Sequence, residues 1–194
     1  MFRDCPNKAL PTGFKFGSGI KNLSYMFFDS DISELPDDFT IPYGVEKTDY
    51  MFTYRPIYSL PANFTLPNTL KSARYMFKSC RNLSGLPNNF TLPNSLLNAD
   101  EMFQQTDELE ILPDCFRLSE SLSSAISMFS RNGKIKTFPE GFTIPDSLIN
   151  AVHMFYYMDE LTHFPSSFKL GKNLLYAQGM FASNTKLSGI CNNF

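Results

Sequence analysis

Two histidines, His153 and His163, are the residues best suited to acid–base chemistry or metal binding. His153 precedes a Met-Phe pair and His163 precedes a Phe-Pro pair, so they hold different positions in the repeat described below. The sequence contains no His-Glu-x-x-His, Cys-x-x-Cys, phosphate-loop or Gly-x-Ser-x-Gly motif. We therefore expect no catalytic residue, no metal and no cofactor.

Acidic residues are densest at Asp107, Glu108 and Glu110. A short acidic run of this kind is typical of a solvated surface rather than of a pair of catalytic carboxylates. We expect these side chains to face solvent.

Four cysteines could suggest disulfides, but their spacing argues against this. Cys5 and Cys80 share a repeat position three copies apart, about 14 Å at the spacing of β-strands, whereas a disulfide needs Cα atoms within about 7 Å. Cys115 and Cys191 are also three copies apart, in two other positions. We expect four free thiols, most of them acting as small buried hydrophobic side chains.

Composition limits the class of partner. The chain has 194 residues, 43% of them hydrophobic, and 17 Lys and Arg against 19 Asp and Glu. Such a balance lacks the positive field with which proteins bind nucleic acid or anionic membranes. No apolar run reaches the roughly 18 to 20 residues that span a bilayer, and the first residues lack the apolar centre of a signal peptide. We expect no nucleic-acid partner and no membrane span.

Met-Phe pairs recur along the whole chain at intervals of 25 or 26 residues. A repeat of this length indicates a repeat architecture, which must set the positions of all the side chains named above. The pairs begin at Met1, Met26, Met51, Met76, Met102, Met128, Met154 and Met180. A second motif, an apolar residue and usually Pro, then two variable residues and Phe, recurs eight times. Its Phe residues are Phe14, Phe39, Phe64, Phe90, Phe116, Phe142, Phe168 and Phe194.

Within each copy, the spacing of apolar residues changes from every second residue to the spacing of a helix. Phe39 and Ile41 flank Thr40, an alternation that predicts a short half-buried strand, and Pro42 then stops it. Further on, apolar residues at Leu96, Ala99 and Phe103 have the spacing of one face of a helical turn. The pattern therefore predicts a short strand and a short helical turn in every copy.

One copy cannot bury its apolar face alone, so the copies are expected to stack. The sequence predicts a repeat solenoid, residues 1–194 as a single domain of about seven and a half coils, without a linker or obvious caps. Seven steps at the strand spacing of roughly 4.8 Å give a body about 34 Å long.

The stretch "MFKSCRNLSGLPNNFTLPNSLLNADEMF", residues 76–103, resembles the BspA-like leucine-rich repeats of bacterial and protist surface proteins. The resemblance covers essentially the whole chain. It departs from the family in the proline-rich step and in having Cys at the usual position only at Cys5 and Cys80. It implies a right-handed leucine-rich-repeat-like array, with short parallel strands on one face and helical turns on the other. It also implies adhesion and protein binding at a cell surface or after secretion, and no shared catalytic residues.

Two groups of side chains are candidates for partner binding. The residues that alternate outward between the apolar positions of the predicted strands include three basic ones, Lys15, Arg117 and Lys169. The stronger group lies in the variable loop after Met-Phe, where aromatic rings, which are enriched at protein interfaces, occupy positions outside the core. These are Phe28, Tyr54, Tyr58, Tyr156 and Tyr157. Some of these rings could instead fold back onto the core.

These features favour a non-enzymatic module that binds a protein or glycan, in surface adhesion or recognition. The alternative is a structural subunit that contacts neighbours, or further copies of itself, through uncapped apolar ends. An enzyme is the least favoured reading, and it is kept only because fold alone does not forbid a grafted site.

Overall fold

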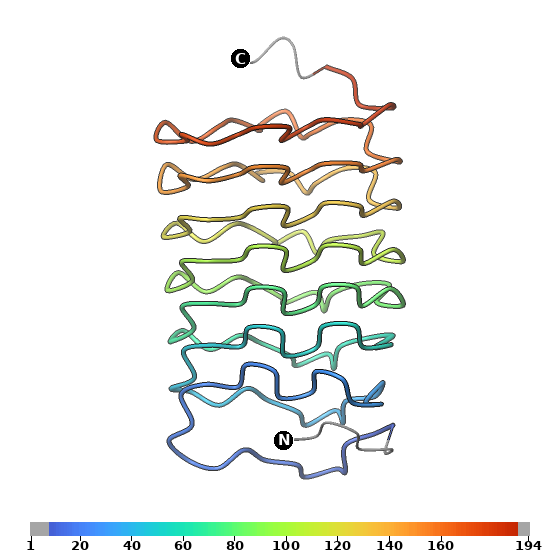
Figure 1. The fold of residues 1–194 in the computed structure, drawn as a ribbon, viewed down its shortest axis with the longest axis vertical. Helices are drawn as coiled ribbons and strands as arrows, with labels where there is room; N and C mark the ends of the chain where they lie inside the picture. Colours follow the sequence, from blue (N-terminus) through green and yellow to red (C-terminus); the bar gives the residue numbers. More distant parts are fainter. Residues whose placement is uncertain (1–7, 190–194) are drawn as a thin grey trace.

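The computed structural model describes residues 8–189. Figure 1 shows the chain winding back and forth in flat layers that are stacked along its longest axis, in sequence order. We call each layer a coil. Within residues 8–189 there is no α-helix and no extended strand, and no helix that could cross a membrane. The ordered structure consists of tight turns and isolated parallel β-bridges between coils.

One column of bridges runs through the stack. It joins residues 25 or 26 positions apart, so each coil pairs in register with the next. The column is Asn22, Lys47, Ser72, Asn98, Ser124, Asn150 and Tyr176. Two further bridges, Ala9 with Glu34 and Gly85 with Ile111, lie on another side of the coils.

From Met26 to Met154, the segment around each Met-Phe pair bonds to the following coil in one direction. In the segment around Met51, the backbone N–H groups of Thr48, Tyr50, Phe52 and Tyr54 donate to carbonyls of the next coil, at 2.8 to 3.0 Å. The N–H groups between them close turns within their own coil, as Met51 does on Thr48. Every second N–H group thus points toward the C-terminal end of the stack.

Two residues per coil have left-handed backbone conformations. They are the residue before each Met-Phe pair and the residue two places after its Phe, as in Tyr50 and Tyr54, with φ of 59° and 62°. Thirteen such positions carry a side chain, with φ from 51° to 63°, and only Gly179 does not. Left-handed backbone is costly for bulky residues and normally favours glycine.

The expected strands are not where the sequence pattern placed them. Phe39 and Ile41 are buried and Thr40 is exposed, so the alternation is present, but no bridge forms at these residues. The N–H group of Phe39 instead closes a turn on the carbonyl of Pro36 at 2.9 Å, and the same turn recurs in the other coils. That N–H is therefore not available to a ladder between coils.

The expected helical turns are also absent. Leu96, Ala99 and Phe103 are buried on one side, as their spacing predicts. However, Ala99 donates its N–H to Ser124 of the next coil, and left-handed conformations at Glu101 and Gln105 interrupt the chain after one turn. The apolar period of a helix is produced here by a succession of single turns.

Two parallel ladders of phenylalanine form the core. In the first, the Phe of each Met-Phe pair stacks on its counterpart, from Phe27 to Phe181, at 5.4 to 6.0 Å between ring centroids. In the second, the Phe of each Leu-Pro motif stacks from Phe14 to Phe168, at 6.2 to 6.4 Å. Edge-on contacts, such as Phe64 with Phe77, join the ladders. The recurrent Phe positions thus stack along the whole described core.

Candidate functional site

Three tyrosines form a stack on the outside of the molecule. Tyr25, Tyr50 and Tyr75 each precede a Met-Phe pair, and their rings lie nearly parallel, with centroids 4.6 and 4.3 Å apart. The first ring is the most open, since Tyr25 is 52% exposed, while Tyr50 and Tyr75 are half-buried. We call these three residues the tyrosine stack.

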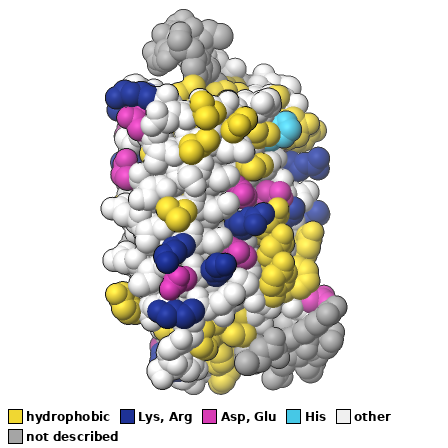
Figure 2. Space-filling view, turned by 60° about the vertical axis from the view of Figure 1, so that its left-hand side comes forward, with side chains coloured by type: hydrophobic (Ala, Val, Ile, Leu, Met, Phe, Trp, Pro, Cys, Tyr) yellow, Lys and Arg dark blue, Asp and Glu magenta, His cyan; other side chains and the backbone are white. Residues whose placement is uncertain are grey.

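Two of the predicted binding residues extend this stack sideways. Phe28 packs its ring edge-on to Tyr25 at 5.6 Å and contacts Tyr54 at 6.2 Å. Tyr54 is 56% exposed. Figure 2 shows hydrophobic side chains gathered in a vertical group on one face, next to Lys, Arg, Asp and Glu. The first coils therefore present a continuous aromatic surface.

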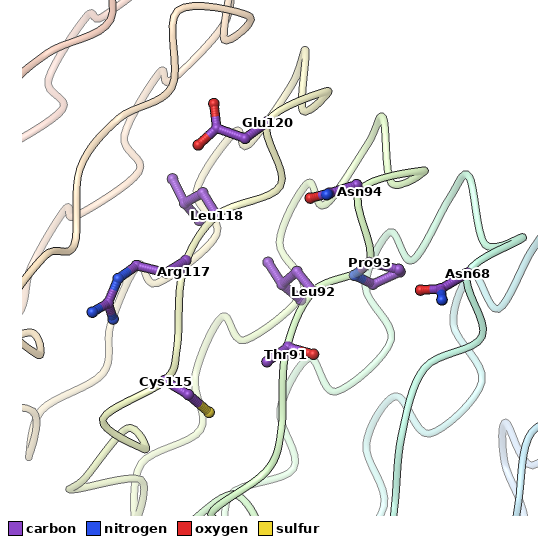
Figure 3. Close-up of a pocket in the computed structure, with 9 residues that line it drawn as sticks. All are labelled: Asn68, Thr91, Leu92, Pro93, Asn94, Cys115, Arg117, Leu118 and Glu120. Carbon is purple, nitrogen blue, oxygen red and sulfur yellow. The ribbon is translucent and has the colours of Figure 1, made fainter.

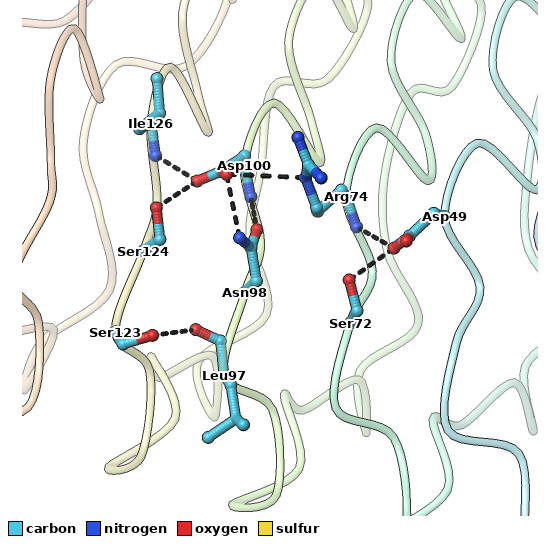
Figure 4. Close-up of polar contacts among 9 residues, drawn as sticks. All are labelled: Asp49, Ser72, Arg74, Leu97, Asn98, Asp100, Ser123, Ser124 and Ile126. Atoms are coloured by element: carbon cyan, nitrogen blue, oxygen red, sulfur yellow. Dashed lines mark hydrogen bonds and ion pairs between the residues drawn. The ribbon is translucent and has the colours of Figure 1, made fainter.

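Two aspartates, each two residues before a Met-Phe pair, bond to the following coil (Figure 4). Asp49 accepts hydrogen bonds from the hydroxyl of Ser72 at 2.6 Å and from the N–H of Arg74 at 3.0 Å. Asp100 does the same for Ser124 and Ile126, at 2.6 and 2.9 Å. Each aspartate satisfies an N–H group of the following coil that has no partner within its own turn.

The cations beside the tyrosine stack are already paired. Arg74 and Lys78 lie over the ring of Tyr75, at 5.5 and 5.2 Å from its centroid. Arg74 also pairs with Asp100 at 3.7 Å, and Lys78 pairs with Glu101 at 2.5 Å. Each of these two cations therefore lies beside a carboxylate as well as beside the Tyr75 ring.

Burial and the neighbouring phenols raise the pKa of two members of the tyrosine stack, Tyr25 and Tyr50. Partial burial raises the pKa of Tyr25, and the Tyr50 phenol raises it further. Partial burial also raises the pKa of Tyr50, followed by its hydrogen bond with Tyr75. Both hydroxyls are therefore neutral hydrogen-bonding groups at physiological pH.

Tyr156 and Tyr157 form a second aromatic group four coils further along. Their rings are 6.0 Å apart, and Tyr156 packs on His153 at 5.1 Å. Tyr156, Tyr157 and His153 occupy the same repeat positions as Phe28, Tyr54 and the tyrosine stack, respectively. Both groups therefore belong to one strip that runs along the stacked coils. We call this strip the left-handed face. It consists of the side chains that precede each Met-Phe pair and of the two side chains that follow it.

The remaining predicted binding residues lie elsewhere. Tyr58 is exposed in the loop beyond the left-handed face, beside Ser33 and Glu34 of the preceding coil. Lys15 pairs with Asp38 at 3.2 Å. Lys169 is exposed at the far end of the same outward column. The structure does not bring these side chains together.

Arg117 lines a shallow hollow of about 410 Å³ on that outward column (Figure 3). Its guanidinium donates to the backbone carbonyls of Asp114, Phe116 and Glu140, and in the figure it points away from Thr91 and Leu92. Arg117 therefore links its own coil to the next through its guanidinium group.

The acidic residues pair with neighbouring coils. Asp107, Glu108 and Glu110 form ion pairs with Arg81, Lys134 and Lys136, at 3.6, 2.5 and 3.2 Å. They lie at the surface, as expected, but each links one coil to the next.

The thiols and histidines also occupy separate places. Cys80 is buried and Cys115 exposed, and both are free thiols, as predicted, whereas Cys5 and Cys191 lie outside the described residues. His163 contacts the hydroxyl of Thr162 at 2.9 Å, away from the face that holds His153. In residues 8–189 no three His, Cys, Asp or Glu side chains are arranged to hold a metal ion.

The tyrosine stack was not predicted from the sequence, although a signal was present. The words "SYMF", "DYMF" and "RYMF" place Tyr at the same repeat position in three successive copies. In a stack of coils, an aromatic residue repeated in register must lie against its own counterparts. The prediction instead concentrated on the loop after Met-Phe.

No protein-family model matches the chain, and none of the curated proteins matches it. The candidate site therefore rests on the geometry of its own residues.

Proposed function

We propose that this protein is a non-enzymatic recognition module that binds a protein or glycan through the left-handed face. The coil array is, in this proposal, a right-handed solenoid of the leucine-rich-repeat type, and its setting is a cell surface or the exterior of a cell. The role of the solenoid is to keep the face straight and its side chains in register.

The observation that supports this is the retention of side chains at left-handed positions. Each such residue costs on the order of 1–3 kcal/mol, and glycine would remove much of that cost. Nevertheless, thirteen of the positions carry side chains, Tyr among them five times. These positions lie along one strip of the molecule, where all of them except Ser79 and Ser127 are partly or fully exposed. Side chains held there at a cost to stability are best explained by a role for that surface.

The composition of the face suits recognition rather than catalysis. Tyr supplies large, rigid contact area together with a polar tip, and is enriched among the residues that dominate binding energy. Gln104, Gln105 and Arg131 between the two aromatic groups add amide and guanidinium groups that can bond to polar partners. An extended partner could contact both aromatic groups at once.

The test compares capture by matched variants on a panel of immobilised oligosaccharides and purified cell-surface glycoproteins. Replacing Tyr25, Tyr54 and Tyr157 with Ser should weaken capture about ten-fold or more, equivalent to about 1.4 kcal/mol. The matched control replaces Tyr43 and Tyr58, which are 83% and 61% exposed but lie off this face. Capture that follows the control variant instead of the first would exclude the left-handed face as the binding surface.

A further inference from the structure

The tyrosine stack brings phenols of different coils into direct contact. The ring planes of Tyr25 and Tyr50 differ by 9°, and those of Tyr50 and Tyr75 by 12°, with centroids within 4.6 Å in both pairs. The hydroxyl groups of neighbouring rings are also hydrogen-bonded, Tyr25 with Tyr50 and Tyr50 with Tyr75, so the ring carbons next to those hydroxyls lie at the same end of each pair. Tyr50 takes part in both pairs.

The stack is open to a soluble oxidant. Tyr25 is half exposed, and the rings of Tyr50 and Tyr75 are each partly exposed to solvent. Because the rings overlap, an electron vacancy created on Tyr25 can be shared with Tyr50 and Tyr75. Oxidation of a phenol to a tyrosyl radical removes one electron and the hydroxyl proton.

We propose that the tyrosine stack is an oxidative cross-linking site, at which Tyr50 forms a dityrosine bond with Tyr25 or with Tyr75. The co-reactant is a one-electron oxidant of the haem-peroxidase class together with hydrogen peroxide. This proposal does not depend on the binding role of the left-handed face.

The chemistry balances as follows. Two phenols each give one electron to the oxidant and one hydroxyl proton to solvent, and hydrogen peroxide is reduced to two water molecules. The two tyrosyl radicals join through a carbon–carbon bond between ring positions next to the hydroxyls. The two ring hydrogens at that bond then return to the oxygens, which restores both phenols.

The product would be a covalent link between adjacent coils. Residues 25 and 50, or 50 and 75, are a full coil apart in sequence, so the bond closes a loop of one repeat. Such a closure reduces the entropy of the unfolded chain and so stabilises the folded array of coils, as a disulfide does.

Other tyrosines provide internal controls. Tyr43 and Tyr58 are more exposed than any member of the stack. Within residues 8–189, neither has an aromatic ring packed against it, so neither is placed to couple within one molecule. If exposure alone governed the reaction, these two residues would react first and would link separate molecules.

The experiment treats dilute protein with a haem peroxidase and limiting hydrogen peroxide, then maps dityrosine by fluorescence and by mass spectrometry of protease digests. The expected result is a monomer in which peptides containing residue 50 are joined to those containing residue 25 or 75. In urea, where the coils are unfolded, this preference should disappear.

Two variants complete the test. Y50F keeps a ring in the stack but has no hydroxyl, so both cross-links should be lost, whereas Y58F should leave them unchanged. Circular dichroism before oxidation verifies that both variants are folded. Cross-links that follow exposure, with Tyr43 and Tyr58 dominant, would overturn the proposal, as would stack cross-links of unchanged yield in Y50F.

Discussion

Pro145 and Gly171 approach each other so closely that no side chain fits between them. A Cβ on Gly171 would lie 2.1 Å from the carbonyl oxygen of Pro145 and 2.7 Å from its carbonyl carbon. The obstacle is backbone of the preceding coil, which cannot rotate away as a side chain would. This contact fixes how tightly two late coils can stack.

Gly171→Ala should therefore lower the free energy of unfolding by about 1–3 kcal/mol, the usual cost of overpacking. Urea denaturation measures the change. Gly17 holds the same repeat position and is the matched control, because nothing lies within 4 Å of a Cβ placed there. Gly17→Ala should be neutral or slightly stabilising. Equal losses in both variants would contradict the role given to Pro145.

Glycine at a left-handed position should stabilise the fold. Arg131 has a φ of 63° and is exposed, so Arg131→Gly removes backbone strain without removing core contacts. We expect a gain of about 1 kcal/mol in the free energy of unfolding. Arg131→Ala keeps the strain and should give no gain. Thr65→Gly, at an exposed position outside the left-handed set, should destabilise; a gain there would show that the effect is not conformational.

A buried Thr–Asn pair joins two coils. Asn132 accepts hydrogen bonds from the N–H and the hydroxyl of Thr106 at 2.9 and 2.8 Å, and both residues are fully buried. Asn132→Ala leaves the Thr106 N–H without an acceptor and should cost about 1–3 kcal/mol. Adding Thr106→Val should cost less than the sum of the single changes, as a double-mutant cycle in urea would measure. Strict additivity would contradict this coupling.

The two described thiols should differ sharply in reactivity. Burial raises the pKa of Cys80 to about 12, whereas Cys115 is exposed. In a variant with Cys5 and Cys191 changed to Ser, a thiol reagent at pH 8 should label Cys115 at once and Cys80 only on unfolding. Because this acid's pKa is raised in the folded state, its contribution to stability is lost as the pH rises above the unfolded value near 9. Rapid labelling of Cys80 under native conditions would show that its site is open.

Acid should weaken the ion pairs that link coils. A hydrogen bond and charge from Lys71 lower the pKa of Glu46, and Lys186 lowers that of Glu160 in the same way. Stability from a carboxylate with a lowered pKa is present above its unfolded pKa and is lost as the pH falls through the lower folded value. The urea midpoint should therefore fall between pH 5 and about pH 3. Glu46→Gln together with Glu160→Gln should reduce that fall, and an identical fall in the variant would exclude these pairs as a cause.

Which side chains form the core could be predicted from the sequence. Met102, Phe103 and Ala99 recur in register, and all three are fully buried, because an apolar residue repeated at a fixed period must meet its counterparts when the copies stack. Phe28 and Tyr54, which the sequence suggested as binding candidates, lie in contact with each other, and their binding role stays a prediction.

The backbone conformation could not be predicted. Nothing about Tyr50 or Gln105 as residue types favours a left-handed φ, which is imposed by hydrogen bonds to the neighbouring coil. The local periods of two and 3.6 residues therefore suggested strands and helical turns, although the backbone forms neither. The role of Arg117 was missed for a related reason: its acceptors are carbonyls, one of them in the next coil, and carbonyls leave no trace in a sequence.

The one-way bonding of the Met-Phe segments also has an electrical consequence. Peptide groups whose N–H bonds point the same way add their dipoles, as they do in an α-helix. In an α-helix the positive end is the N-terminal one. Here the N–H groups of Thr48, Tyr50, Phe52 and Tyr54 point to the following coil, so these segments place their positive pole toward the C-terminal coils. Along the stacking axis, the dipole of these segments is therefore opposite to that of an α-helix whose chain runs from the N-terminal to the C-terminal coils.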